Sequence, residues 1–297
     1  MPGPAPFGTA IGRLCRAYMS KPYDFIAGFR DCGRKFLDAA IPVLEAQRAE
    51  SNVGLYEPVT DEVLGGLLAR VFRFLQTFVL DYHLWADDLG RVVLRIMLEG
   101  VFYMRFLTEQ NQPELFLAFQ KYGIGQEKLY KMQLRKMLEE GKLEDSPELR
   151  DFIDSESDEE IADELVSVRL KNFEDLRKLA TDAGMKDEYV LHYQPDSTIV
   201  HGHWPALRRY YLEACREPLH RLHLQPRFNL PPLNPQLLDR AFRLFMAAYE
   251  LWVKRYGLDD RVTPLVDQYF ENCNAVTAND ETPQVRGPGE EEPEHRG

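Results

Sequence analysis

Apolar residues recur at helical spacing along almost the entire chain, and this periodicity constrains the fold more than any other feature of the sequence. In residues 22–50, for example, Phe25, Phe29 and Phe36 follow three- and four-residue steps. That spacing places apolar side chains along one face of an α-helix. The same pattern predicts helices at 60–81, 85–109, 113–140, 158–182, 235–256 and 260–274. Alternation typical of strands is scarce, so the predicted fold class is all-α.

Glycine and proline residues leave the continuity of some segments open. Gly123-Ile124-Gly125 is a candidate break within residues 113–140. Residues 186–214 read as two short helices with a break near Pro195 or Pro205, because proline clashes with the preceding turn inside a helix. Residues 225–235 contain four prolines and are predicted to form a loop.

These elements predict a single multi-helix bundle of about eight to ten helices. The α-helical domain is expected over residues 22–276, after an N-terminal arm at 1–21. Residues 277–297 are rich in Gly, Pro and Glu, and we expect them to form a disordered acidic C-terminal tail.

The acidity of the chain is concentrated in two stretches. The formal net charge of the 297 residues is -12. Residues 144–164 contain eleven acids and one Arg, and residues 277–297 contain six acids and two Arg, which leaves about +2 for the remainder. The low overall pI therefore does not exclude a nucleic-acid partner. The first stretch is predicted to form an acidic hinge or lid.

Three features favour a cytoplasmic protein with no membrane partner. The N-terminus lacks the basic and apolar regions of a secretory signal, and no uncharged apolar run reaches the length of a membrane-spanning helix. The four cysteines are far apart in sequence and form neither a disulfide framework nor a C-x-x-C pair.

A narrow polar stripe in residues 91–106 is the first candidate site. Arg91, Arg95, Glu99 and Tyr103 recur every four residues, and almost everything between them is apolar. A buried Arg–Glu pair is costly unless it is well hydrogen-bonded. The stripe predicts either a polar pocket lined by Arg95, Glu99 and Tyr103 or an ion pair along a slit of exposed surface.

The second candidate is the run of residues 189–204. Tyr189, Tyr193, Ser197 and His201 are again four residues apart and would share one face of a continuous helix. Two phenols, a hydroxyl and an imidazole are suited to proton transfer and hydrogen bonding. Pro195 leaves the position of Tyr193 open. The alternative is a structural role, in which Ser197 and His201 hydrogen-bond a neighbouring helix.

Histidines cluster in the same part of the chain. Five of the seven histidines lie between residues 192 and 223, and Cys215 lies among them. Their spacing matches no strong metal-binding signature, so neither a metal ligand set nor a cofactor is predicted. His203 and Arg221 are instead candidates for binding a phosphate-containing substrate. Phosphate-loop, dinucleotide-binding and nucleophile-elbow motifs are absent from the sequence.

Three stretches of this sequence resemble the bacterial family known as domain of unknown function 5677. They are residues 94–107, residues 115–131 and residues 173–207, the last of which carries the Tyr-x3-Tyr-x3-Ser-x3-His-Gly spacing. The resemblance spans roughly residues 85–225, and the run at 215–223 is similar to a subset of the family.

The resemblance implies a bacterial α-helical protein without an established activity. It also implies that two residue sets converge: Arg95, Glu99 and Tyr103 would face Tyr189, Tyr193, Ser197 and His201. A looser, fold-level resemblance is to HEPN-type helical ribonucleases of toxin and phage-defence systems, whose Arg-before-His motif is missing around His201.

Three hypotheses of different classes follow from these patterns. The first is a metal-independent ribonuclease or phosphodiesterase of a toxin or phage-defence type. In it, His201 is the general acid/base, Arg95 neutralises phosphate charge, and Ser197 and Tyr189 orient the substrate, beside Glu99 in the same pocket. The second is a non-catalytic helical interaction module with a structural buried polar network. The third is a metalloprotein built on the histidine cluster. The partners to be tested are RNA, another phosphate-containing ligand, and a second copy of the chain.

Overall fold

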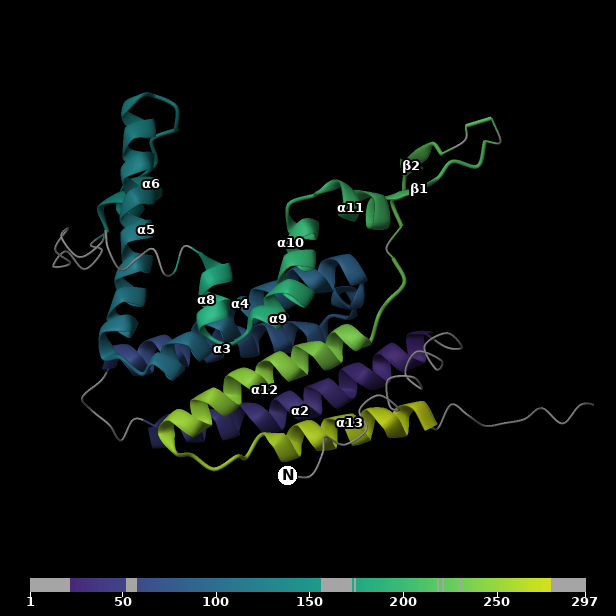
Figure 1. Ribbon diagram of the computed structural model, residues 1–297, viewed down its shortest axis with the longest axis horizontal. Coiled ribbons are helices and arrows are strands. Elements are labelled where there is room, and N and C mark those ends of the chain that lie inside the picture. Colours follow the sequence, from purple (N-terminus) through teal and green to yellow (C-terminus); the bar gives the residue numbers. More distant parts are fainter. Residues whose placement is uncertain are drawn as a thin grey trace, which may run out of the picture.

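The computed structural model describes residues 22–51, 58–155, 173, 175–217, 219–220, 222–229 and 231–278. The described chain is all-α, as predicted, with one short hairpin (Figure 1). The long helices are α2 (Pro22–Ser51), α3 (Pro58–Leu80), α4 (Asp87–Gln110), α5 (Pro113–Glu139), α12 (Gln236–Tyr256) and α13 (Thr263–Ala278). The shorter elements are η1 (Tyr82–Trp85), α6 (Pro147–Asp154), α8 (Leu176–Asp182), α9 (Lys186–Glu188), η3 (Tyr189–Tyr193), α10 (Gln194–Val200), α11 (Trp204–Ala206), η4 (Leu207–Tyr211), β1 (Leu212–Ala214) and β2 (Leu224–Pro226).

Several predicted segments lie outside the described residues. They are the N-terminal arm at 1–21, the tail from residue 279 onward and most of the predicted helix at 158–182. The acidic stretch at 144–164 is described only as far as residue 155. This described part contains α6, which packs against α5.

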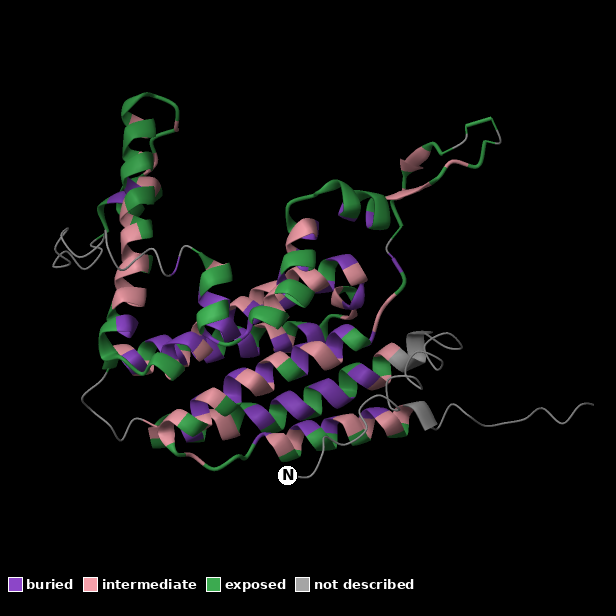
Figure 2. Ribbon diagram, in the orientation of Figure 1, coloured by how far each residue is buried: buried purple, intermediate pink, exposed green. Residues whose placement is uncertain are grey.

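The body of the molecule is formed by α2, α3, α4, α12 and α13, which lie side by side (Figure 1). Helix α12 packs on both α3 and α4, while α13 packs on α2, which in turn contacts α3. The faces that meet are buried, and the opposite faces are exposed (Figure 2). This arrangement follows from the apolar stripe on each helix, because burial of such stripes is the main force that packs helices together.

Aromatic side chains from distant parts of the sequence fill the middle of this body. The ring of Phe242 on α12 lies 5.2 Å from Phe36 on α2 and stacks on Tyr269 of α13 at 4.6 Å. The same contact region brings Cys32 of α2 into a hydrogen bond with Cys273 of α13. Two cysteines that are far apart in sequence are therefore neighbours in the core.

Among the described residues, one helix is long and apolar enough to cross a membrane, namely α3. Half of its most apolar window is buried inside the fold, which is what a core helix of this composition shows. Leu64, Val71, Leu75 and Phe78 on this helix are fully buried. These four side chains therefore belong to the core of the body.

Helix α5 is continuous through Gly123 and Gly125, which the sequence analysis identified as a candidate break. It projects from the body, with α6 packed against it (Figure 1). The contact includes Lys131, whose Nζ donates to the Ser155 carbonyl at 3.0 Å and to its hydroxyl at 2.9 Å. These bonds satisfy a lysine that is almost fully buried.

The helical run from residue 186 continues through Pro195 to Val200 and breaks only at His201–His203, where Gly202 has a φ of 60°. Beyond this break, α11 and η4 lead into the β1–β2 hairpin, which extends away from the long helices (Figure 1). The predicted loop at 225–235 therefore begins inside strand β2, and Leu233 adds an isolated bridge to Ala86.

Candidate functional site

The two predicted polar motifs meet where α10 packs on α4. Arg95 of α4 donates from Nε to the Ser197 hydroxyl at 2.9 Å and from Nη2 to the Tyr193 hydroxyl. The guanidinium carbon also lies 4.4 Å from the centre of the Tyr193 ring. Glu99, one turn further along α4, lies 3.8 Å from the Arg95 Nη1. Arg95 thus joins both motifs in a partly buried setting, with 18% of its side chain exposed.

A π-helical turn explains why Pro195 does not disturb this face. In η3 the Gln194 N–H donates to the Tyr189 carbonyl, five residues back instead of four. The wider turn accommodates a residue that has no N–H of its own, and such turns occur often at functional sites. Tyr189 and Tyr193 remain on the same face, with their rings stacked at 5.1 Å.

Next to Arg95, a fully buried carboxylate ties three helices together. Asp196 of α10 has no exposed side-chain surface. It accepts from Arg91 of α4 at 3.0 Å and from Arg240 of α12 at 3.3 Å. Burial raises the pKa of Asp196, and the two guanidinium groups offset this effect only in part. The same burial lowers the pKa of Arg240. Each charged group therefore needs the opposite charge of the other to stay ionised in this buried position.

Asp87, at the start of α4, extends the network toward the hairpin. It accepts from Arg91 at 3.1 Å, from the Tyr210 hydroxyl at 2.7 Å and from Asn234 at 3.3 Å. Burial tends to raise the pKa of Asp87, but the hydrogen bond from Tyr210 and the charge of Arg91 outweigh it and lower the pKa. Asp87 therefore links α4 to η4, the element that leads into the hairpin.

Tyr103 lies away from the Arg95 contacts, at the other end of the stripe. Its ring is 5.2 Å from that of Phe119 and 6.5 Å from that of Phe173. Burial and the nearby Glu99 raise the pKa of Tyr103 to about 12. Burial and Glu99 have the same effect on Tyr193, whose pKa is about 12. Both phenols therefore carry their protons at neutral pH and can donate hydrogen bonds.

His201 and His203 lie at the surface, just beyond the end of α10. Their rings stack on each other at 5.6 Å, and both side chains are exposed. The His201 N–H continues the helical pattern by donating to the Ser197 carbonyl at 3.1 Å. Within the described residues, no hydrogen bond or ion pair joins either imidazole to Arg95 or Glu99. Arg221 lies outside the described residues.

Several members of this cluster were absent from the predicted site, among them the charged residues Asp87, Asp196 and Arg240; Arg91 was in the predicted stripe but not among the predicted pocket residues. A signal for Asp87 was available, because it stands four residues before Arg91 and continues the same stripe. The sequence held no comparable signal for Asp196 or Arg240. The two residues are 44 positions apart, and they meet because α10 and α12 both pack on α4.

Comparison with known proteins gives one match to a family. The model of the family of unknown function DUF5677 matches residues 61–217, which is more than half of the chain. The chain belongs to this family. No curated protein and no solved structure matches.

The DUF5677 match covers α4 and α10 and therefore includes both halves of the cluster around Arg95. It ends before α12, so Arg240 lies outside the matched residues. It also ends within the hairpin loop, after Cys215 and before His220. The match names no activity, and the looser likeness to HEPN-type ribonucleases finds no counterpart in it.

Proposed function

We propose that the protein binds single-stranded RNA on the segment from His201 to Phe228, called here the projecting segment. The observation that carries this proposal is the exposure of basic and aromatic side chains along it. The segment contains five arginines and two glutamates, a net charge of +3 in a chain whose total is -12. Positive charge attracts the RNA backbone, and exposed rings provide surfaces on which bases stack.

The exposed rings belong to Trp204 and Phe228, which are 61% and 93% exposed. Arg208 and Arg216 are exposed on the same segment. Large aromatic side chains are normally buried in a folded protein, so rings this exposed beside arginines suit contact with a partner. Single-stranded RNA matches both features, because its bases can unstack and its phosphates are charged.

The buried network supports this proposal by fixing the base of the segment. Arg91 and Arg240 hold Asp196 of α10, while Asp87 holds Tyr210 of η4. The polar groups in these contacts are hydrogen-bonded to one another and lie mostly beneath the surface. In this proposal, Arg95 and Ser197 keep α10 in place on α4, and the residues that touch RNA follow α10 in the chain.

A change at Trp204 tests the binding proposal. We expect Trp204→Ala to weaken the binding of a short fluorescent single-stranded RNA roughly fivefold or more, because one stacking surface is removed. Fluorescence anisotropy measures this affinity. Tyr130→Ala is the matched control, because Tyr130 is 53% exposed but lies on α5. Equal affinities for the wild type and both variants, or binding to anionic vesicles but not to RNA, would overturn the proposal.

A second function, metal-independent cleavage of the bound RNA, is favoured by the paired imidazoles of His201 and His203. One imidazole can take the proton from a ribose 2′-hydroxyl as its oxygen attacks phosphorus. The other can give a proton to the departing 5′-oxygen, which leaves a 2′,3′-cyclic phosphate and a 5′-hydroxyl. Two stacked, exposed rings 5.6 Å apart are close enough to serve one phosphodiester.

Cleavage is tested by incubating RNA with purified protein in the presence of EDTA. We expect cyclic-phosphate products from the wild type and from His83→Asn, an exposed histidine on η1. We expect none from His201→Asn, and none from any protein when the RNA carries 2′-deoxyriboses. If RNA binds and no product forms, the protein is a non-catalytic RNA-binding module.

A further inference from the structure

The hairpin register brings Cys215 and His223 opposite each other. Strand β1 pairs with β2 in antiparallel register, and Ala214 faces Leu224. Cys215 follows the first strand directly and His223 precedes the second. The Cys215 N–H donates to the His223 carbonyl at 2.9 Å, so the ladder continues to this pair.

Two tight turns then return His220 to the same place. The His220 N–H donates to the Glu217 carbonyl at 3.0 Å, and the His223 N–H donates to the His220 carbonyl at 3.1 Å. Between the histidines, Leu222 has a φ of 64°, in the left-handed region that is unfavourable for leucine. Its side chain is 99% exposed, so burial does not compensate for this conformation.

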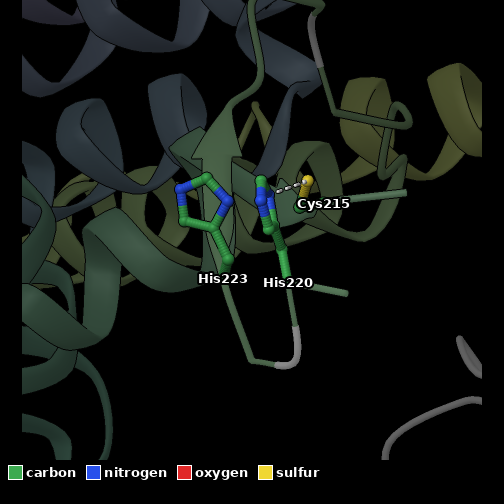
Figure 3. A group of neighbouring side chains, drawn as sticks. All are labelled: Cys215, His220 and His223. Carbon is green, nitrogen blue, oxygen red and sulfur yellow. Dashed lines mark hydrogen bonds between the residues drawn. The ribbon is translucent and has the colours of Figure 1, made fainter. Parts of the chain in front are cut away.

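The three side chains converge at the closed end of the hairpin (Figure 3). Their ligand atoms all lie within 4.8 Å of one another, and the Cys215 Sγ is 3.8 Å from the His220 Nδ1. In a tetrahedral zinc site, sulfur and nitrogen ligands are separated by about 3.5 Å, as follows from their bond lengths to the metal. Small side-chain rotations would therefore bring all three atoms to coordination distance.

We propose that Cys215, His220 and His223 bind a zinc ion. Thiolate and imidazole are the ligands that zinc prefers, whereas magnesium and calcium prefer oxygen. Three protein ligands leave the fourth position of a tetrahedral ion open to water. His220 and His223 are exposed and Cys215 is partly exposed, so the ion can enter from solvent.

Zinc at this position would act as a clip across the hairpin loop. It would connect both ends of the loop to His220, and binding would then be coupled to the order of the loop. The inference does not rest on RNA binding, because it depends only on the geometry of these three side chains. It also sharpens the sequence analysis, in which the spacing of these residues matched no metal signature and a metalloprotein built on the histidine cluster was the third hypothesis.

Metal titration of the reduced, metal-free full chain tests the proposal. We expect one equivalent of zinc to bind, as measured by competition with a chromophoric chelator. Cobalt should replace it and give a thiolate-to-cobalt charge-transfer band. Cys215→Ser should remove that band and weaken zinc binding roughly a hundredfold, and His220→Asn and His223→Asn should each weaken it strongly.

The matched control is the double variant His201→Asn/His203→Asn, which removes the other histidine pair of the projecting segment. It should retain zinc and the cobalt band. As a second readout, zinc should slow cleavage by trypsin after Arg216 in the wild type but not in Cys215→Ser. Failure of the wild type to bind zinc, or equal zinc affinity in Cys215→Ser, would overturn the proposal.

Discussion

At the scale of single residues, Asp196 is the buried charge on which the contacts among α4, α10 and α12 depend. Its carboxylate is fully buried and contacts one arginine from α4 and one from α12. A buried charge pair of this kind adds little net stability compared with apolar packing, but the loss of one partner leaves the others uncompensated. Without Asp196, Arg240 would be left in that state, while Arg91 would keep its ion pair with Asp87.

We expect Asp196→Asn to lower the free energy of unfolding by about 3 kcal/mol or more, because the largely buried Arg240 loses its counter-charge and Arg91 keeps only Asp87. Urea unfolding followed by circular dichroism measures the change. Asp31→Asn is the matched control, since Asp31 pairs with Lys35 on the exposed face of α2 and should have a far smaller effect. Equal effects of the two variants would contradict the role assigned to Asp196.

Asp87 should give the protein a stability that depends on pH. Its pKa is lower in the folded protein than the ordinary value near 4, which applies to the unfolded chain. The stabilisation is therefore complete above about pH 4 and is lost as the pH falls through the folded pKa.

The variant Asp87→Asn isolates this contribution. The difference in unfolding free energy between the wild type and the variant should be constant near neutral pH and should shrink below about pH 4. Chemical unfolding at a series of pH values measures it. A difference that stays constant into the acid range would show that the charge of Asp87 is not the stabilising feature.

At the scale of elements, the sequence predicts helices well and their interruptions poorly. The apolar spacing located α2, α3, α4, α12 and α13 because each buries one face. The effect of Pro195 was not predictable, because a π-helical turn removes the clash that proline causes in a regular helix. The short β1–β2 hairpin was not predicted because strands of three residues are too short to show an alternating pattern.

Close packing of α4 against η1 should make Gly90 irreplaceable. A Cβ at this position would lie 2.2 Å from the Leu84 carbonyl oxygen, and backbone cannot move aside as a side chain can. We expect Gly90→Ala to cost about 1–3 kcal/mol of stability, as other overpacked core positions do. Thermal unfolding measures the change.

Gly66 on α3 provides the matched comparison. Nothing lies within 4 Å of a Cβ added there. Gly66→Ala should therefore stabilise the protein by about 0.5–1 kcal/mol, through the higher helix propensity of alanine. Destabilisation by both substitutions to the same extent would contradict the close approach of α4 to η1.

At the scale of the whole molecule, the sequence pattern located some members of the cluster around Arg95 and missed others. The four-residue spacing on α4 and on the 189–201 run located Arg95, Tyr193 and Ser197, which meet in the fold. Pairings that depend on tertiary packing or on strand register were not predictable. Arg240 with Asp196 is one case, and Cys215 with His220 is another.

The distribution of charge over the molecule leads to the central proposal. The acidic residues that set the net charge of -12 are concentrated at 144–164 and 277–297, while the projecting segment is positive. An overall charge of this sign would repel RNA, so any attraction has to be local. The dependence of binding on salt concentration reports how many local charges contact phosphate.

The most direct test is the affinity for single-stranded RNA as a function of salt concentration, in the wild type and in Arg208→Ala/Arg216→Ala. We predict salt-dependent binding by the wild type. The slope of log affinity against log salt should fall by roughly 1.4 in the double variant, because two phosphates are no longer neutralised by arginine. Arg30→Ala/Arg34→Ala removes the same charge from the exposed face of α2 and should leave the slope unchanged. Equal slopes for the two double variants, or no salt-dependent binding by the wild type, would contradict RNA binding on the projecting segment.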